Sequence, residues 1–204
     1  LTKKITDLTP NIKIISEENL INKENKNLKD FWLIDPIDGT YDYINGKDEF
    51  TINAALILNK KPVAGIINAP DKNRLFYSFG LSNSFELSNK SKTELTCKKK
   101  SKDNEINAVA YSNNPKPEIT AIYKKYNITN FTRMKSSLKF CVIASGEFDF
   151  YAAEPRACEW DIAAGHAILE HAGGIITDFD GNNINYGKKE FKNPSLILKR
   201  GKIL

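Results

Sequence analysis

The feature that most constrains this chain is a short apolar run that meets an Asp-Pro pair. Residues 31–34 read FWLI, a run typical of a buried strand, and Asp35 and Pro36 follow directly. We expect the strand to stop there and a new element to begin, because proline cannot donate to a sheet ladder. Asp35 and Asp38 then lie three residues apart across a turn fixed by Pro36. Such a turn directs both carboxylates toward one point.

The two residues after Asp38 add a phosphate-binding element. Gly39 lets the backbone approach a ligand closely, and the amides of Gly39 and Thr40 can face an anion, especially where a helix begins. Residues 35–40 therefore combine cation ligands with a phosphate cradle. An Asp-Pro turn followed by an Asp cap is the alternative interpretation, and the hexapeptide alone leaves it open.

Two further acidic sites lie elsewhere in the chain. Glu17 and Glu18 follow the strand-like run IKIIS at residues 12–16, although an isolated acidic pair is usually solvated surface. Asp161 opens a predicted helix of small residues, where its position also suits an N-cap. A cap and a metal ligand are compatible roles for Asp161.

The composition is that of a soluble globular protein. The 204 residues are 41% hydrophobic and 27% charged, which excludes a disordered, collagen-like or simple coiled-coil chain. Lys60 and Lys61 interrupt the most apolar region, residues 50–70, so we predict no membrane span. The net charge of +5 is mild for a nucleic-acid binder and suits anionic small molecules. The lysine cluster at residues 98–102 has no interleaved aromatic residues, so we interpret it as a solvated loop.

The cysteines and the first residues indicate the compartment. Cys97, Cys141 and Cys158 form no CxxC pair and leave an odd thiol in any disulfide scheme, which favours a reducing compartment. Residues 1–18 have neither the apolar core nor the cleavage site of a signal peptide. We therefore expect a cytoplasmic protein, with peripheral association with the inner face of the membrane as an alternative.

Strand and helix signals alternate along the chain and predict a layered mixed α/β (α+β) fold. We expect one domain over residues 1–204, divided at the lysine-rich residues 96–105 into a lobe of about 1–95 and a carboxy-terminal α/β lobe of about 105–204. The expected strands are at 12–16, 31–34, 106–112, 148–151, 175–179 and 195–200, with an antiparallel meander over 50–79. The expected helices are at 1–8, 118–126, 137–146 and 161–174.

The motifs together resemble a known family. WLIDPIDGTYDYI at residues 32–44, EWDIAAGHAILEHAGG at 159–174 and IISEE at 14–18 resemble the lithium-sensitive, magnesium-dependent phosphatases of the inositol monophosphatase superfamily. The resemblance covers essentially all 204 residues. EFTINAALI and SSLKFCVIASGEFDFY look most like the CysQ branch, the 3'(2'),5'-bisphosphate nucleotidases that hydrolyse adenosine 3',5'-bisphosphate.

The resemblance implies a metal site. Its ligands would be the backbone carbonyl of Ile37 together with four carboxylates, those of Glu17, Asp35, Asp38 and Asp161. Four converging carboxylates cannot all stay ionised unless cations neutralise them. Ligation by oxygen alone selects a hard ion, and phosphate chemistry makes Mg²⁺ the first choice. Two or three Mg²⁺ ions are expected, and lithium is expected to inhibit.

The resemblance also implies a reaction without a covalent enzyme intermediate. Water activated by Mg²⁺ would attack phosphorus directly, with Glu17 and Thr40 orienting the nucleophile. Glu17, Asp38 and Thr40 would therefore be the catalytic residues. The remaining substrate contacts would come from Ile37, Asp38, Gly39, Thr40 and Asp161, with Gly39 and Thr40 holding the scissile phosphate.

Two further positions bear on the substrate. Lys139 resembles the family position near the nucleotide, with a solvated helix lysine as the alternative. Glu154 lies where inositol phosphatases have a glutamate that faces substrate hydroxyls. The chain departs from the nucleotidase pattern at residues 111–118, where YSNNPKPE replaces a Ser-Arg-Ser-His element, and at Lys135, which replaces a glycine. The Pro-Arg pair usual after Tyr151 is also absent, and Arg156 could supply a similar charge from a nearby position.

We expect hydrolysis of the 3'-phosphate of adenosine 3',5'-bisphosphate, and of phosphoadenosine phosphosulfate as a further substrate. The enzymatic alternative is an inositol or other sugar monophosphatase, and the distant alternative is a non-catalytic phosphate-binding module. The expected partner is a small-molecule phosphate ester and not a nucleic acid polymer. The sequence does not set the oligomeric state.

The resemblance implies a sugar phosphatase fold of alternating helix and sheet layers whose amino-terminal helices are missing from this sequence. Family members carry two helices and an aspartate upstream, and that aspartate pairs with the motif threonine, here Thr40. We expect the physical protein to be longer, because Leu1 is not a methionine. A protein beginning at Leu1 is expected to aggregate and to be impaired in catalysis.

Overall fold

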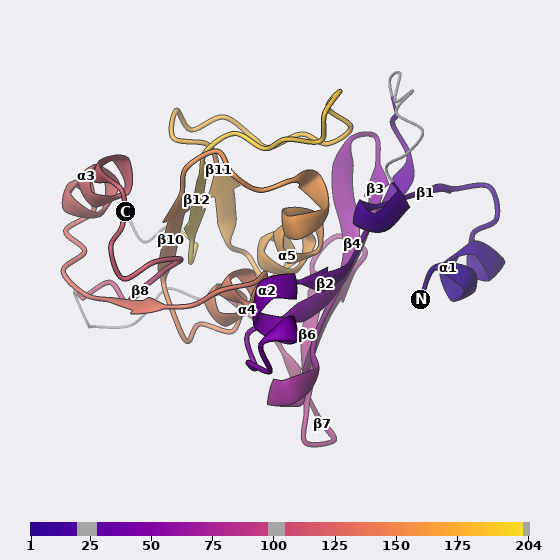
Figure 1. Ribbon diagram of the computed structural model, residues 1–204, viewed down its shortest axis with the longest axis horizontal. Helices are drawn as coiled ribbons and strands as arrows, with labels where there is room; N and C mark the ends of the chain where they lie inside the picture. Colours follow the sequence, from indigo (N-terminus) through magenta and orange to yellow (C-terminus); the bar gives the residue numbers. More distant parts are fainter. Residues whose placement is uncertain (20–27, 98–104, 202–204) are drawn as a thin grey trace.

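The computed structural model describes residues 1–19, 28–97 and 105–201. Its layers follow one another across Figure 1, with α5 and α4 between two sheets and with α1 and α3 on the two outer sides. The helices are α1 (Thr2–Leu8), α2 (Thr40–Ile44), α3 (Pro117–Lys125), α4 (Leu138–Ala144) and α5 (Glu159–His171), and the 3-10 segments are η1 (Glu17–Asn19) and η2 (Pro70–Lys72). The predicted layered α/β (α+β) fold is confirmed.

The first sheet has seven strands whose spatial order follows the chain. β1 and β2 pair in parallel, and each later pair of neighbours is antiparallel. The predicted meander is confirmed, but β6 and β7 were not predicted; β7 consists of four exposed polar residues and shows no alternation. The strands are β1 (Lys13–Ser16), β2 (Phe31–Asp38), β3 (Thr51–Leu58), β4 (Lys61–Ala69), β5 (Arg74–Phe79), β6 (Asn83–Ser88) and β7 (Ser91–Glu94).

The prediction that the strand stops at Asp35 and Pro36 is wrong. β2 continues to Asp38, and its pairing with β3 shifts register between Asp35 and Asp38. Asp35 lies opposite Asn53 and Asp38 lies opposite Thr51, so β2 has one extra residue in this interval. Pro36 is tolerated there because a bulge leaves a residue outside the ladder. The bulge turns the end of β2, where both motif aspartates lie.

The second sheet has the strand order β11-β12-β10-β8-β9. Its outer face is covered by α3, whose Ile119 and Tyr123 are buried while Ile122 and Tyr126 are partly buried against the same cluster, as the helix pattern predicts. β9 was not predicted, because three residues give too short a pattern. The strands are β8 (Ala108–Ala110), β9 (Phe131–Arg133), β10 (Phe150–Ala153), β11 (Ile175–Thr177) and β12 (Leu196–Lys199).

The helix α5 fills the space between the sheets because its residues are small. A side chain at Gly65 of β4 would collide with the carbonyl of Ala164, and one at Gly165 would collide with Phe140 of α4. These close approaches bury almost the whole helix in the main core. The helix begins at Glu159, two residues before the predicted start.

The proposed lobe boundary at residues 96–105 falls mostly outside the described residues. Among the helices that the structure describes, none is long and apolar enough to cross a membrane.

Candidate active site

The parallel pairing of β1 and β2 brings two acidic residues to one edge of the first sheet. Ser16 of β1 lies opposite Ile34 of β2, and the strands run in the same direction. Glu17 directly follows Ser16 and Asp35 directly follows Ile34, so the two acidic residues come at the same level of the sheet. Glu17 opens η1 and is exposed, whereas Asp35 is only 1% exposed. The amide of Ile37 donates to Asp35 Oδ1 at 3.0 Å, which fixes the buried carboxylate in the bulge.

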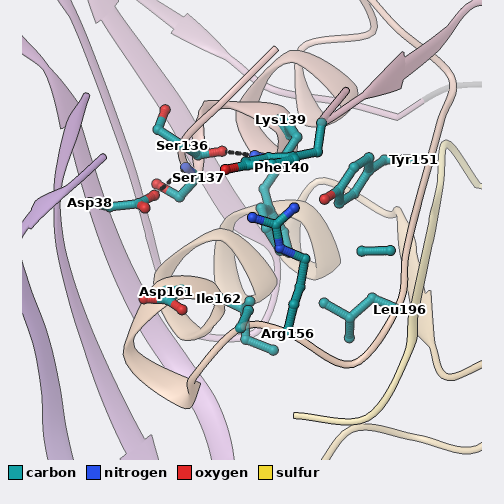
Figure 2. Close-up of a pocket in the computed structure, with 13 residues that line it drawn as sticks. Asp38, Ser136, Ser137, Lys139, Phe140, Tyr151, Arg156, Asp161, Ile162 and Leu196 are labelled. Atoms are coloured by element: carbon teal, nitrogen blue, oxygen red, sulfur yellow. Dashed lines mark hydrogen bonds between the residues drawn. The ribbon is translucent and has the colours of Figure 1, made fainter. Parts of the chain in front are cut away.

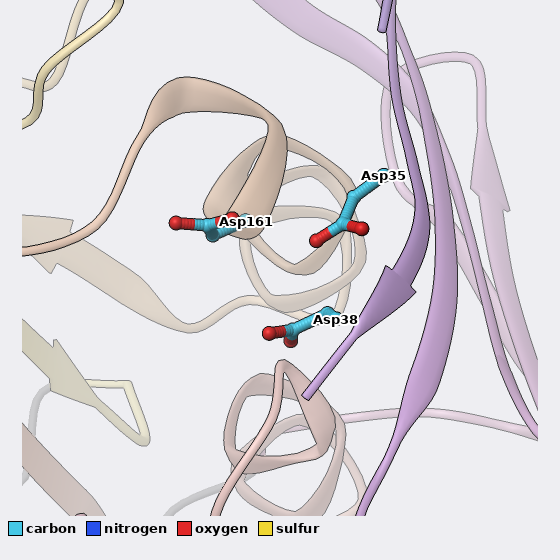
Figure 3. A group of neighbouring side chains, drawn as sticks. All are labelled: Asp35, Asp38 and Asp161. Carbon is cyan, nitrogen blue, oxygen red and sulfur yellow. The ribbon is translucent and has the colours of Figure 1, made fainter. Parts of the chain in front are cut away.

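Three aspartates converge between the end of β2 and the start of α5 (Figure 3). One carboxylate oxygen from each of Asp35, Asp38 and Asp161 lies within 4.8 Å of the other two. Asp161 is the third residue of α5 and accepts the amide of Cys158 at 2.7 Å, so the N-cap is Cys158 and the predicted N-cap role of Asp161 is wrong. Its carboxylate serves a capping box and still faces the other two.

The electrostatics of the cluster require a cation or protons. Burial, followed by the charges of Asp38, Glu17 and Asp161, raises the pKa of Asp35 to about 9. Burial and the charge of Asp38 raise the pKa of Asp161 to about 7, and burial also raises the pKa of Asp38. Three carboxylates that resist ionisation are a donor set for a hard divalent ion, and Mg²⁺ fits their all-oxygen chemistry.

The predicted phosphate cradle follows the cluster directly. Gly39 has a φ of +95° and caps α2, and a Cβ there would lie 2.8 Å from the carbonyl oxygen of Glu49. Only glycine fits this close, left-handed turn. The hydroxyl of Thr40 donates to the carbonyl of Ile37 at 3.0 Å, so these two groups, both predicted site atoms, are in contact.

Asp38 is also held from the other half of the molecule. The backbone amide of Ser137, at the start of α4, donates to Asp38 Oδ2 at 2.5 Å. The Ser137 hydroxyl donates to Asn53 Oδ1 at 2.7 Å and lies 2.8 Å from the Thr51 hydroxyl. These contacts were not predicted, because 99 positions separate Ser137 from Asp38 and no local pattern marks the pair.

A cavity of about 120 Å³ opens beside the cluster (Figure 2). Asp38 and Asp161 form one wall, and two cations, Lys139 and Arg156, lie among the residues that line it. Lys139 is 6% exposed, so the alternative of a solvated helix lysine is wrong. Burial lowers the pKa of its ammonium to about 8. An anion that enters this cavity meets two cations next to the candidate metal ligands.

Aromatic rings hold these cations. Arg156 stacks on Tyr111 with its guanidinium carbon 3.3 Å from the ring centre, and Lys139 Nζ lies 5.4 Å from the ring centre of Tyr151. Neither tyrosine was predicted as a site residue. Tyr151 ends the predicted strand 148–151, and its position at a strand end was the available signal.

A second cavity of about 210 Å³ adjoins the first and shares Tyr111, Tyr151 and Arg156 with it. Glu154 lines this second cavity and pairs with Lys116 at 2.9 Å. The predicted substrate residue Glu154 is therefore set apart from the carboxylate cluster.

Comparison with known proteins gives the family. The sequence profile of the inositol monophosphatase family matches residues 1–202. The chain belongs to this family. Inositol monophosphatase family members are phosphatases, so the three aspartates and the cavity lie in a phosphatase fold.

Bisphosphate nucleotidases are among the similar family members. The chain is 32% identical over 202 residues to the 3'(2'),5'-bisphosphate nucleotidase CysQ of Aggregatibacter actinomycetemcomitans, covering 97% of this chain and 75% of that protein. It is 34% identical over 190 residues to CysQ of Buchnera aphidicola, covering 91% and 69%. The crystal structure of CysQ from Bacteroides thetaiotaomicron superposes with a TM-score of 0.83 at 26% identity, covering 97% of this chain and 81% of that one.

Proposed function

We propose that this inositol monophosphatase family member is a Mg²⁺-dependent phosphomonoesterase that hydrolyses the 3'-phosphate of adenosine 3',5'-bisphosphate. The observation that carries the proposal is a pair of cations, the buried Lys139 and the exposed Arg156, in the cavity that Asp38 and Asp161 also line. A substrate with two phosphates has one group for the metal ligands and another for these cations.

The metal ligands in this proposal are Asp35, Asp38 and Asp161, with the Ile37 carbonyl and Glu17 at the edge of the group. Mg²⁺ bound there would lower the pKa of a water molecule and neutralise charge on the scissile phosphate. Glu17 is exposed, and its charge raises the pKa values of Asp35 and Asp161. An exposed carboxylate next to the cluster suits a residue that orients water better than it suits a buried ligand.

Residues 38–40, at the end of β2 and the start of α2, would position the phosphate and the nucleophile. The amides of Gly39 and Thr40 face the phosphate from the turn before α2. The Thr40 hydroxyl donates to the Ile37 carbonyl. It could break this hydrogen bond and form one with the attacking water instead. The Asp38 carboxylate is oriented through Oδ2, which accepts both the Ser137 amide and the Thr51 hydroxyl.

The cations bind the part of the substrate that does not react. Lys139 and Arg156 would pair with the 5'-phosphate, and the adjoining cavity would take the nucleoside. The CysQ relatives at 32% and 34% identity support a nucleotide substrate. Phosphoadenosine phosphosulfate carries the same 3'-phosphate and is the expected second substrate, and lithium is expected to inhibit.

An inositol or sugar monophosphatase is the second candidate, because Glu154 lines the adjoining cavity and a carboxylate can accept hydrogen bonds from sugar hydroxyls. The pairing of Glu154 with Lys116 speaks against it, since that carboxylate already has a partner.

A substrate panel tests the proposal. Phosphate release would be measured from adenosine 3',5'-bisphosphate, phosphoadenosine phosphosulfate, inositol 1-phosphate and fructose 1,6-bisphosphate, each with Mg²⁺ and with excess chelator. We expect the adenosine bisphosphates to be preferred in kcat/KM and every activity to vanish in chelator. A preference for inositol 1-phosphate would favour the second candidate.

A further inference from the structure

Residues 134–137 connect β9 of the second sheet to α4 and lead directly to the cavity lysine. Ser136, Ser137 and Lys139 all line the cavity beside the carboxylate cluster. The motif residues Asp38 to Thr40 belong to the other sheet and to α2. The site is therefore assembled from two parts of the chain, and its geometry depends on how residues 134–137 sit on the motif.

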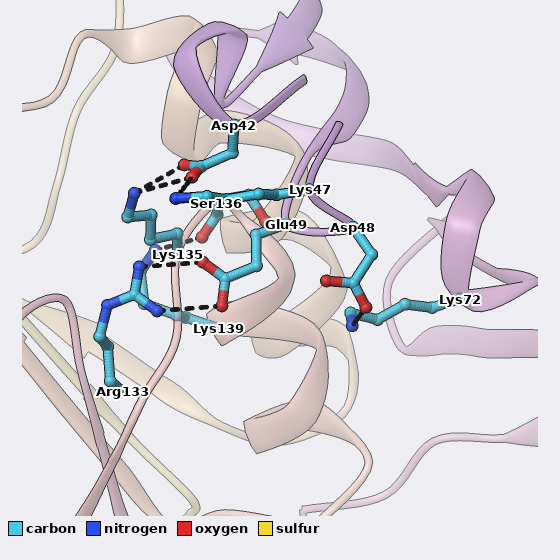
Figure 4. Close-up of polar contacts among 9 residues, drawn as sticks. All are labelled: Asp42, Lys47, Asp48, Glu49, Lys72, Arg133, Lys135, Ser136 and Lys139. Carbon is cyan, nitrogen blue, oxygen red and sulfur yellow. Dashed lines mark hydrogen bonds and ion pairs between the residues drawn. The ribbon is translucent and has the colours of Figure 1, made fainter. Parts of the chain in front are cut away.

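Two ion pairs join residues 133–135, at the end of β9, to residues of α2 and of the segment that follows it (Figure 4). Lys135 Nζ donates to both carboxylate oxygens of Asp42 in α2, at 2.9 and 2.8 Å. Arg133 makes a two-pronged contact with Glu49, at 3.2 and 3.1 Å. Charged hydrogen bonds of this kind are stronger than neutral ones and are specific in direction.

The pair between Lys135 and Asp42 is the more enclosed of the two. The side chains of Lys135 and Asp42 are 18% and 3% exposed, against 33% and 24% for Arg133 and Glu49. Asp42 also has Lys47 at 3.6 Å, but Lys47 is half exposed and lies in the segment that directly follows α2. Of these two lysines, Lys135 alone connects Asp42 to the second sheet.

The next residue shows why this segment must be held. Ser136 has a φ of +54°, a left-handed conformation that residues other than glycine rarely adopt. Such a conformation persists where the surroundings determine it. In this conformation the Ser136 carbonyl accepts a hydrogen bond from Lys139 Nζ, and the next amide, that of Ser137, reaches Asp38.

We propose that Lys135 is a positioning residue: its ion pair with Asp42 docks residues 134–137 on α2 and so sets the place of Lys139 in the cavity. Lys135 does not line the cavity and acts through Ser136. The kinetic part of this inference rests on the proposed function, because it assigns the second phosphate of the substrate to Lys139.

The kinetic test compares two substrates that differ by one phosphate. Lys135→Ala is expected to raise KM for adenosine 3',5'-bisphosphate about tenfold, the size of one charged hydrogen bond lost. A fall in kcat, which would come through the bond between the Ser137 amide and Asp38, is expected to be equal for the two substrates. KM for adenosine 3'-monophosphate, which has no second phosphate, is expected to stay unchanged. A general loss of folding would affect both substrates equally.

Control variants separate the effect of the ion pair between Lys135 and Asp42 from that of any positive charge near Asp42. Lys47→Ala removes the other cation next to Asp42 and is expected to leave both KM values unchanged. Lys135→Arg keeps a cation opposite Asp42 and is expected to retain the parent protein's KM for adenosine 3',5'-bisphosphate. If Lys135→Ala does not fold because the buried Asp42 keeps only the half-exposed Lys47 as a partner, the double variant Lys135→Ala with Asp42→Asn removes both charges. This double variant is expected to show the same selective rise in KM.

An exchange measurement tests the docking without any substrate. Hydrogen exchange at the Ser137 amide is expected to be at least about tenfold faster in Lys135→Ala than in the parent protein and in Lys47→Ala. Unchanged exchange, or an equal rise in KM for both substrates, would overturn the proposal. If the parent protein does not distinguish the two substrates, the proposed function fails, and the exchange result alone then decides whether Lys135 docks the segment.

Discussion

The backbone amide of Ser137 donates to the carboxylate of Asp38 at 2.5 Å, although 99 positions separate the two residues. This bond joins the start of α4 to the end of β2 at the candidate metal site. A metal ligand is thus oriented by the same segment that carries the cavity lysine. In the proposed function, one segment therefore positions both a metal ligand and the partner of the second phosphate.

Replacing a single aspartate of the cluster should abolish activity without unfolding the protein. Asp38→Asn and Asp161→Asn each keep an oxygen that can accept the amide of Ser137 or Cys158. Because loss of an outer-shell partner of a metal ligand already costs about 10- to 100-fold, we expect loss of a ligand charge to lower kcat by more than about a hundredfold. Steady-state kinetics and thermal melting check this. Turnover within tenfold of the parent protein for either variant would contradict the assignment.

The metal-free protein should lose stability as pH rises. The pKa values of Asp35 and Asp161, about 9 and about 7, lie above their unfolded values near 4, so the folded state holds more protons between about pH 4 and pH 9. The stabilisation from these protons is complete below about pH 4 and is lost as pH rises through 7 and 9. Melting temperatures in chelator should therefore fall from pH 5 to pH 9.

Asp35→Asn is the matched variant for this pH dependence. It removes the group with the most raised pKa and keeps an oxygen for the Ile37 amide. We expect it to melt at a higher temperature than the parent at pH 8 in chelator and to be stabilised less by Mg²⁺. A parent protein whose melting temperature is independent of pH in chelator would show that the cluster is not under charge repulsion.

Binding of the second phosphate should weaken above about pH 8. Burial lowers the pKa of Lys139 to about 8, so its ammonium loses the proton as pH rises through that value. We expect KM for adenosine 3',5'-bisphosphate to rise between pH 8 and pH 9.5. In Lys139→Met, KM should be raised at least about tenfold at pH 7 and should not change over this range. A KM–pH profile identical in the two proteins would exclude Lys139 as the phosphate partner.

Glu154 separates the two candidate substrates. Because Glu154 pairs with Lys116 and lies in the adjoining cavity, we expect Glu154→Gln to change kcat/KM for adenosine 3',5'-bisphosphate by less than about threefold. If Glu154 binds sugar hydroxyls, the same variant should instead reduce hydrolysis of inositol 1-phosphate, measured in parallel. A tenfold or greater loss on the nucleotide would place Glu154 against the nucleoside.

The sequence predicted the parts of the fold and site that depend on local pattern. Asp35, Asp38 and Asp161 follow from two motifs, and the helical face of α3 follows from its periodicity. The end of β2 was missed because a bulge accommodates Pro36, and β7 was missed because an exposed edge strand needs no apolar residues.

The remaining features of the site depend on contacts across the chain. The family resemblance predicted Glu17 as a ligand; it lies outside the three-carboxylate group and its side chain is exposed, so its role stays a prediction. The amide of Ser137 and the ion pair between Lys135 and Asp42 depend on how the two sheets pack. No local pattern encodes a contact across about 90 positions.

We propose that the cluster of aspartates and the two cavity cations, Lys139 and Arg156, act on two phosphates of one substrate. The most direct test is the ratio of kcat/KM for adenosine 3',5'-bisphosphate to that for adenosine 3'-monophosphate, measured on the full-length protein in saturating Mg²⁺. We expect this ratio to be about ten to a hundred, because one charged hydrogen bond to the second phosphate contributes a factor of that size. A ratio of one or less would contradict it.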